Sequence, residues 1–166
     1  MYQVGDTVFY GTEGVCRVAE ICEMKVNREK AEYYVLHPIY REGSTVFVPL
    51  KNELLLSRMR PLLTKKQIDR MIEEVNQTDE DWIDDASERK AEFQRILISA
   101  ERRDLLAMVR MLYLRRQNLE TVGKRLRTND EQMLRDAEKL LNDEFSVVLG
   151  IQPSKVPEYI RGKLKE

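Results

Sequence analysis

The chain has 166 residues, of which 34% are charged and 42% hydrophobic, and its formal net charge is −1. This length allows one or two domains, and the apolar content is too high for a disordered protein. The near-zero charge excludes a polycation, so nucleic-acid binding would require basic residues gathered in one region. We find neither a long apolar run nor a signal-peptide pattern, and expect a cytoplasmic protein without a membrane span.

Residues 4–18, VGDTVFYGTEGVCRV, predict two short strands joined by a turn. The β-branched and aromatic residues of the stretch TVFY favour the first strand. Gly11 and Gly14 permit the turn, because glycine adopts positive φ without strain. From residue 15 to residue 21 the side chains alternate with period two, which indicates the second strand. The polar residues 23–30 are predicted to form a hairpin tip.

Further strands are predicted at residues 31–39, 45–49 and 57–60, with a helical turn at residues 52–56. Short strands packed this closely along the chain are typical of a small antiparallel β-barrel of the Tudor or SH3-like type. We therefore predict such a barrel over residues 1–61.

A barrel of this size encloses no ligand cavity, so its function would lie on its outer face or at an exposed strand edge. Residues 45–49 are the candidate edge, which would add a strand from a partner protein. The alternative is an ordinary core strand. The candidate residues are Thr45, Val46, Phe47, Val48 and Pro49, with Val46 and Val48 on one face and Thr45 and Phe47 on the other.

After residue 62 the pattern changes from period two to a helical period. Apolar stripes predict helices at about residues 65–75, 79–98, 102–117 and 128–149, and a last short helix capped by Ser154. Gly150 is a natural stop for the fourth of these helices. Helices with short connections predict an all-α bundle over residues 62–166, so the whole chain is predicted to be an α+β protein.

The basic residues of the helical part gather in residues 89–127, which contain eleven Lys and Arg against four Asp and Glu. A basic region on a near-neutral protein is the electrostatic footprint of phosphate binding. The alternative is a solvated helix face. The candidate DNA-contacting residues are Trp82, Arg89, Lys90, Arg115, Arg116, Lys124, Arg125 and Arg127.

Trp82 is the only tryptophan, and it precedes the basic region. An aromatic side chain beside basic residues can press on an exposed base at a distorted step of the minor groove. The alternative is a core tryptophan that fills the space between helices, since tryptophan is usually well buried.

The order V-G-D-x-V-x-Y, a glycine turn, E-Y-Y-x-L and a V-P strand resembles the CarD family of bacterial transcription regulators. It is also similar to the polymerase-binding domain of the transcription-repair coupling factor. The resemblance implies a Tudor-like barrel that docks on the β subunit of RNA polymerase, partly by pairing strand edges. Some relatives carry arginine where this chain has Met24 and Phe47, and Lys25 and Arg28 are the basic candidates nearby.

The similarity continues to about residue 151, through RMLYL at residues 110–114 and DEQML at residues 130–134. It implies that the helical domain binds promoter DNA at the upstream edge of the transcription bubble, with a tryptophan wedged into the minor groove. The resemblance implies that Trp82 has this role here. The chain departs from the family in having acidic residues between Trp82 and the first bases, and Asp130 and Glu131 where relatives can carry basic residues.

Nothing in the sequence indicates catalysis. His37 is the only histidine, and the chain has no phosphate-binding glycine loop and no metal-ligand spacing. We expect no enzyme activity, cofactor, metal or small-molecule substrate. We predict instead an adaptor, nucleoid-associated through RNA polymerase, that holds polymerase and promoter DNA together and stabilises the open promoter complex. The alternative is a polymerase-docking adaptor whose helical domain binds another protein.

Overall fold

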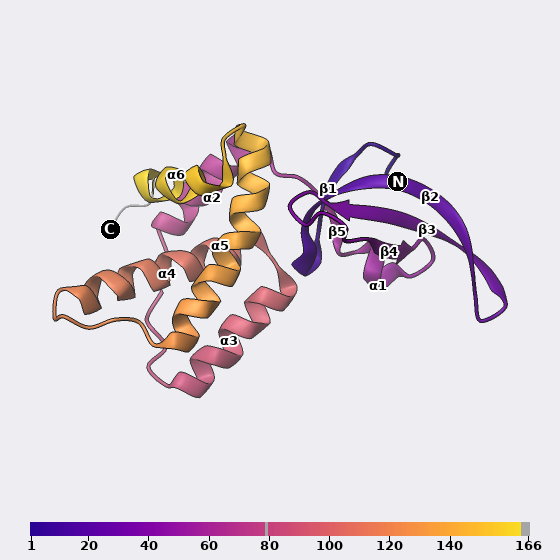
Figure 1. Ribbon diagram of the computed structural model, residues 1–166. Helices are drawn as coiled ribbons and strands as arrows, with labels where there is room; N and C mark the ends of the chain where they lie inside the picture. Colours follow the sequence, from indigo (N-terminus) through magenta and orange to yellow (C-terminus); the bar gives the residue numbers. More distant parts are fainter. Residues whose placement is uncertain (79, 164–166) are drawn as a thin grey trace. The chain divides into compact units, whose positions relative to one another are not determined.

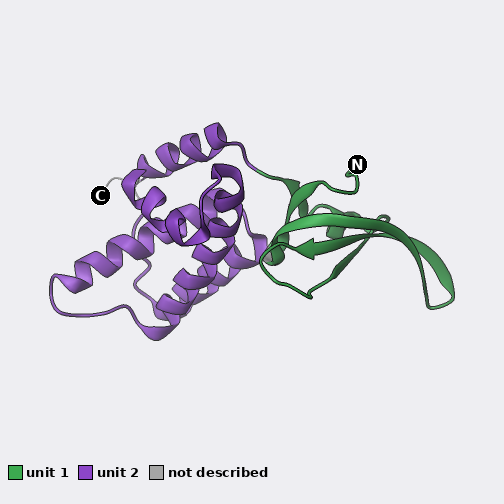
Figure 2. Ribbon diagram, turned by 45° about the horizontal axis from the view of Figure 1, so that its top comes forward, with its two compact units in different colours: residues 1–62 green, residues 63–166 purple. Residues whose placement is uncertain are grey.

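The structure is a computed structural model, and it describes residues 1–78 and 80–163. The chain forms two compact units, Met1–Leu62 (unit 1) and Leu63–Glu166 (unit 2), as Figure 2 shows. The sequence placed the boundary between residues 61 and 62. No helix among the described residues has both the length and the apolar character needed to cross a membrane.

Unit 1 contains an antiparallel sheet of five strands in the order β4-β3-β2-β1-β5. The strands are β1 (Thr7–Tyr10), β2 (Gly14–Val26), β3 (Glu29–Pro38), β4 (Val46–Pro49) and β5 (Met59–Pro61). A 3₁₀ turn, η1 (Gly11–Glu13), joins β1 to β2, and helix α1 (Glu53–Leu56) precedes β5. The strand order is open and ends at β4 and β5 (Figure 1), so closure into the predicted barrel is not confirmed.

The long hairpin of β2 and β3 corrects one prediction. Residues 23–30 were expected to form a polar tip, but the strands remain paired as far as Val26 and Glu29. Only Asn27 and Arg28 form the turn, with φ values of 52° and 68°. A two-residue turn with positive φ at both positions matches the right-handed twist of the flanking strands, which allows pairing to continue to the tip.

One face of the sheet carries the core of unit 1, because alternate side chains of each strand point to the same face. Its buried residues are Val8, Tyr10, Cys16, Val18, Tyr34, Leu36, Val48 and Met59. Leu55 and Leu56 of α1 pack against them. The Asn52 side chain accepts a hydrogen bond from the Leu55 N–H and so caps α1. The predicted helical turn at residues 52–56 is therefore confirmed.

Unit 2 is helical and belongs to the all-α type. Its helices are α2 (Lys65–Asn76), α3 (Ala86–Ser99), α4 (Arg102–Glu120), α5 (Thr128–Leu149) and α6 (Val156–Lys163). The 3₁₀ turn η2 (Pro153–Lys155) lies before α6 and contains Ser154, so Ser154 does not cap the last helix as predicted. The apolar stripes of α2, α3, α4 and α5 supply the largest fully buried side chains of unit 2, among them Ile68, Phe93, Leu105 and Phe145.

The start of α3 corrects a second prediction. The sequence suggested a helix from about residue 79, a position outside the described residues, but α3 begins at Ala86. The Asp85 side chain accepts a hydrogen bond from the Glu88 N–H at 2.9 Å, which makes Asp85 the N-cap. Residues 80–84 therefore form a non-helical segment ahead of α3, and Trp82 lies on this segment rather than on a helix.

Candidate polymerase and nucleic-acid interfaces

The predicted docking edge coincides with an end of the sheet. β4 pairs with β3, from Tyr33 opposite Pro49 to Leu36 opposite Val46, and it has no second neighbour among the strands of the described residues. A terminal strand presents backbone N–H and C=O groups to the outside, where another chain can pair with them. The geometry of β4 is therefore compatible with strand addition.

The side chains of β4 alternate as the sequence suggested. Val48 is fully buried, and Val46 packs against the core of unit 1. Phe47 points to the opposite face and is 48% exposed. An exposed phenylalanine on a terminal strand combines an open backbone edge with an apolar anchor for a partner.

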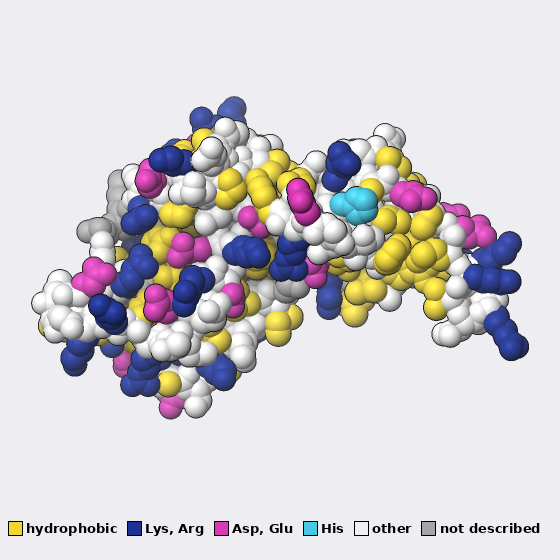
Figure 3. Space-filling model, viewed as in Figure 1, with side chains coloured by type: hydrophobic (Ala, Val, Ile, Leu, Met, Phe, Trp, Pro, Cys, Tyr) yellow, Lys and Arg dark blue, Asp and Glu magenta, His cyan; other side chains and the backbone are white. Residues whose placement is uncertain are grey.

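Apolar residues lie beside Phe47 on the same face of the sheet, and Val35 among them is buried, with 6% of its surface exposed. The strand register places Val35 directly opposite Phe47, and Tyr33 opposite both Pro49 and Cys22. Residues opposite one another in an antiparallel pair share a face. We name Phe47, Val35, Pro49, Tyr33 and Cys22 the edge strip. Figure 3 shows hydrophobic side chains at the surface of unit 1 around β3 and β4.

The two basic candidates of unit 1 lie beyond one end of the edge strip, towards the hairpin turn and away from Phe47. Lys25 of β2 lies opposite Lys30 of β3 near the end of the hairpin, and Arg28 lies in the hairpin turn. Lys30 lies on β3 some 17 Å from Val35, at roughly 3.4 Å per residue. Both basic side chains are exposed. A partner would have to extend along the hairpin to contact them together with Phe47.

Trp82 of unit 2 is partly buried rather than enclosed in the core. Its ring packs edge-on against Phe93, with 6.4 Å between centroids. The guanidinium carbons of Arg89 and Arg115 lie over the ring, 4.7 Å and 5.2 Å from its centroid. Such cation–π contacts hold the indole beside positive charge.

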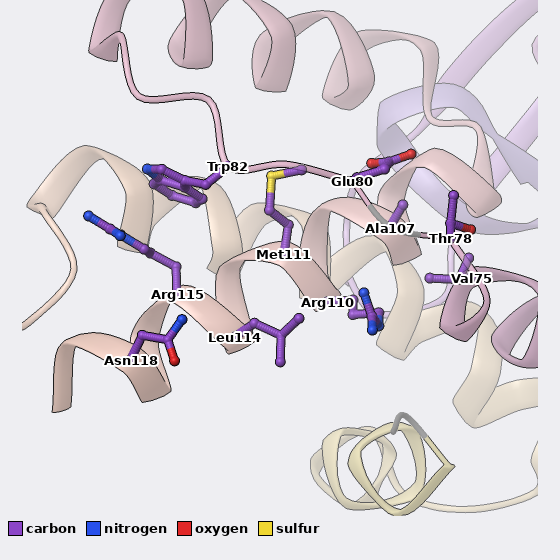
Figure 4. Close-up of a pocket in the computed structure, with 10 residues that line it drawn as sticks. All are labelled: Val75, Thr78, Glu80, Trp82, Ala107, Arg110, Met111, Leu114, Arg115 and Asn118. Carbon is purple, nitrogen blue, oxygen red and sulfur yellow. The ribbon is translucent and has the colours of Figure 1, made fainter. Parts of the chain in front are cut away.

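Trp82 also borders an open space beside α4. It lines a cavity of about 200 Å³ together with Met111, Leu114 and Arg115, which Figure 4 shows in close-up. In that view the indole and the Arg115 side chain lie next to each other at one end of the cavity. Trp82 thus lines a surface cavity while Phe93, Arg89 and Arg115 pack against its ring.

Arg89, a predicted DNA contact, faces the interior of unit 2. It is only 5% exposed, and its Nε and Nη2 donate to the two carboxylate oxygens of Asp130, each at 2.9 Å. Its Nη1 donates to the Ile83 carbonyl at 2.9 Å. Arg89 therefore ties the segment of residues 80–84 to the start of α5, and we remove it from the candidate DNA contacts.

The loop between α4 and α5 presents the remaining bases. Gly123 adopts a φ of 71°, and the Lys124 N–H donates to the Leu119 carbonyl at 2.8 Å, which closes the end of α4. Leu126 is 9% exposed and anchors the loop in the interior. The neighbouring side chains of Lys124, Arg125 and Arg127 are exposed as a result.

These bases meet Trp82 around one cavity of about 250 Å³. We name Trp82, Arg115, Lys124, Arg125 and Arg127 the basic pocket. The lining also includes the Arg89–Asp130 pair, which is neutral as a pair, and Asp84. Four bases against Asp84 leave a net charge of +3 on the lining, which favours phosphate.

The other two candidates of unit 2 do not line the basic pocket. Lys90 is exposed on α3. The Arg116 guanidinium lies 5.1 Å from the Tyr113 ring centroid and interacts electrostatically with Glu138. The structure thus gathers five of the eight predicted DNA contacts around one cavity. Arg89 lies beside them but is paired with Asp130, whereas Lys90 and Arg116 lie outside the basic pocket.

Sequence reasoning missed the buried carboxylates that neutralise part of the basic region. Glu144 is fully buried and accepts hydrogen bonds from Arg102 Nε at 2.9 Å, Arg102 Nη2 at 3.0 Å and the Leu63 N–H at 2.9 Å. Arg95 pairs with Glu92 and Arg103 with Glu74 at the surface. A signal was available, because Glu144 lies four residues after Leu140 on the apolar stripe of α5.

Unit 1 matches a known protein family. Residues 2–61 match the family of the CarD-like/TRCF RID domain, and unit 1 therefore belongs to this family. The resemblance predicted for the N-terminal part is confirmed for residues 2–61, and this domain indicates interaction with RNA polymerase and a role in transcription. The match does not extend into unit 2. A search among curated proteins found no match to the chain.

Proposed function

We propose that this protein is a transcription regulator without catalytic activity, which docks on the β subunit of RNA polymerase through unit 1 and contacts promoter DNA through unit 2. The observation that carries the proposal is the exposed terminal strand β4 in a domain of a polymerase-interacting family. In this proposal β4 adds to a strand of the β subunit, and Phe47 enters an apolar site beside that strand.

The basic pocket supports the DNA part of the proposal. Lys124, Arg125 and Arg127 are exposed and anchored by a short loop, which suits contacts to phosphate. Trp82 lies among them with part of its ring accessible. At the upstream edge of the bubble, where base steps are distorted, the indole would press on an exposed base from the minor groove.

Docking on polymerase makes the DNA contact effectively intramolecular, so a weak contact is sufficient. A protein that binds the opened promoter more tightly than the closed one shifts the equilibrium between them by that difference in affinity. No chemical step is required.

The docking half is tested by the substitution Phe47→Arg. We expect purified RNA polymerase to lose retention of this variant, because a charged side chain replaces the apolar anchor. Ile98→Arg is the matched control, since Ile98 is an exposed hydrophobic residue of unit 2, 70% accessible, and polymerase should retain it normally. Normal retention of Phe47→Arg would exclude β4 as the docking edge.

The DNA half is tested by the lifetime of the open promoter complex on isolated polymerase. We expect the protein to lengthen it and Trp82→Ala to lose most of that effect while the fold survives. An unchanged lifetime with the unaltered protein on several promoters would overturn the proposal. A large loss of thermal stability in Trp82→Ala would instead assign the tryptophan to the core.

A polymerase adaptor whose helical unit binds a protein is the second candidate, because buried and surface carboxylates neutralise several bases of residues 89–127. The dependence of binding on ionic strength distinguishes the DNA-binding regulator from the protein-binding adaptor. Binding of promoter DNA through four phosphate contacts should weaken with a slope of about −3.6 in log K against log salt concentration. Absence of any promoter-dependent tightening at low salt would favour the protein-binding adaptor.

A further inference from the structure

Unit 2 has a second cavity whose chemistry is opposite to that of the basic pocket. Its volume is about 600 Å³, and it lies between residues 80–83, α3 and α4. The floor is apolar and comes from both helices and the preceding segment. Its apolar residues are Ile83, Phe93, Ile96, Ala107, Met108 and Met111. We name this cavity the acidic groove.

Carboxylates surround the apolar floor from three elements. They are Glu80 and Asp81 of the segment before α3, Glu88 and Glu92 of α3, and Asp104 of α4. The one base in the lining, Arg95, is bonded to Glu92 at 2.6 Å and 3.1 Å. Five carboxylates against one guanidinium leave a net charge of −4 on the lining.

Most of this negative charge is not neutralised within the part of the chain that the structure describes. Glu80, Asp81 and Glu88 are exposed, and no ion pair to a described residue involves them. Their charge repels phosphate, so the acidic groove is not an extension of the DNA surface. It favours a positively charged ligand instead.

The segment of residues 80–84 separates the two chemistries. Trp82 lines the basic pocket, whereas Glu80, Asp81 and Ile83 line the acidic groove. The segment of residues 80–84 thus contributes the Trp82 ring to the basic pocket, and it contributes Asp81 and Ile83 to the acidic groove.

We propose that the acidic groove binds a basic amphipathic helix of a partner protein. An apolar stripe of that helix would lie on the floor, while its Lys and Arg side chains would reach the carboxylates on the rim. The volume of the groove falls within the range of sites that enclose ligands. The thioether of Met111 is partly exposed and adapts to side chains of different shape, as at other helix-binding surfaces, while the buried Met108 lies beneath the floor. This function is independent of polymerase docking and of DNA binding.

The test uses the full chain labelled with ¹³C at the methionine methyl groups. The probe is an amphipathic peptide of Leu and Lys with leucines at i, i+3, i+4 and i+7. We expect saturable shifts of the Met108 and Met111 methyl signals. A peptide of the same composition, with its leucines distributed around the helix, should produce none.

Charge reversal identifies the site. We expect the double substitution Asp81→Lys and Glu88→Lys to weaken peptide binding at least about tenfold, through repulsion of the lysines. The pair Glu73→Lys and Glu158→Lys makes the same charge change at exposed positions outside the groove and should leave binding unchanged. Alanine substitution of Lys124, Arg125 and Arg127 should also leave it unchanged.

Three results would overturn the proposal: no shift at Met108 and Met111, equal binding of the two peptides, or equal affinity of the Asp81→Lys/Glu88→Lys variant. The first two are measured on the unaltered chain, so they hold whether or not a variant folds. Loss of peptide binding in the alanine variant of the basic pocket would place the peptide outside the groove and have the same consequence.

Discussion

Two groups of bases in unit 2 carry the same charge but have different surroundings. Arg89 and Arg102 are buried, and each forms a bidentate ion pair with a buried carboxylate, Asp130 and Glu144 respectively. Lys124, Arg125 and Arg127 are exposed, and they follow one another in a short loop. The first group connects helices, and the second leaves its charge available to a ligand.

The difference teaches that a count of charges does not locate a binding surface. Residues 89–127 have an excess of basic residues in the sequence, but the two buried arginines contribute none of it to the surface. Their guanidinium groups are matched by carboxylates and by backbone carbonyls. What remains exposed is smaller, and Lys124, Arg125 and Arg127 of it lie beside Trp82.

The largest expected effect comes from breaking a buried pair. Glu144→Ala should lower the free energy of unfolding by about 3–5 kcal/mol, because it leaves the Arg102 guanidinium buried without a partner. The Leu63 N–H also loses its acceptor. Urea denaturation followed by Trp82 fluorescence measures unit 2 alone, since this is the only tryptophan of the chain.

Glu92→Ala is the matched control for this prediction, because it removes a carboxylate from the exposed pair with Arg95. Exposed pairs contribute about 0–1 kcal/mol. Equal destabilisation by the two substitutions would mean that the pair of Arg102 and Glu144 has no special role in connecting α4 to α5.

A smaller effect is expected from Arg89→Lys, which keeps the charge but removes the planar fork. Lysine cannot donate to both oxygens of Asp130 and to the Ile83 carbonyl together. We expect a loss of about 2 kcal/mol in the free energy of unfolding, the range for hydrogen bonds to charged groups. The emission of Trp82 should change as well, because Arg89 fixes the segment on which it lies.

Arg95→Lys makes the same exchange at an exposed site and should alter neither stability nor emission. If Arg89→Lys left the Trp82 emission unchanged, Arg89 would stabilise unit 2 without positioning the tryptophan. The comparison of buried and exposed arginines would then concern stability alone.

The third prediction concerns the exposed bases. Alanine at Lys124, Arg125 and Arg127 should weaken promoter DNA binding at least about tenfold, or 1.4 kcal/mol. The slope of log K against log salt concentration should fall by about 2.7, at about 0.9 per phosphate contact. The free energy of unfolding should stay within about 0.5 kcal/mol of the unaltered chain.

Lys66, Arg135 and Lys139 are exposed bases outside the basic pocket, and their triple alanine variant is the control. It removes the same charge from unit 2. If both triple variants reduced the salt slope equally, DNA would respond to the overall charge of unit 2 and not to the basic pocket.

Local signals predicted most of the elements. Alternation, glycine turns and helix stops depend on residues close in sequence, so the strands of unit 1 and the stop at Gly150 followed from them. The predicted start of α3 at about residue 79 was wrong, because the side chain of Asp85 caps the helix.

The candidate site was harder to predict because it depends on distant pairs. Arg89 and Asp130 are 41 residues apart, and Arg102 and Glu144 are 42 apart, so no local pattern pairs them. Even for the neighbouring residues Leu126 and Arg127, the sequence does not predict which side chain is buried. Only the packing of the bundle shows that Leu126 is buried and its basic neighbours exposed.

The smallest effect distinguishes two carboxylates of α5. Glu144 forms a bidentate ion pair with Arg102, whereas Glu138 is only partly buried. Burial raises the pKa of Glu138 above the usual 4.5, although Arg116 and Tyr113 act in the opposite direction. The folded state therefore takes up this proton at a higher pH than the unfolded state. Stability from Glu138 should be complete below about pH 4.5 and should be lost as the pH rises through the raised pKa.

Glu138→Gln should remove this component of the pH dependence of unfolding, measured by urea denaturation from about pH 4 to about pH 8, a range that includes the usual glutamate pKa of 4.5. Glu131→Gln changes an exposed position of the same helix and should leave the component in place. If Glu138→Gln also preserved it, another group would be responsible. Neutralising a carboxylate of α5 would then matter only where an arginine is buried with it, as at Asp130 and Glu144.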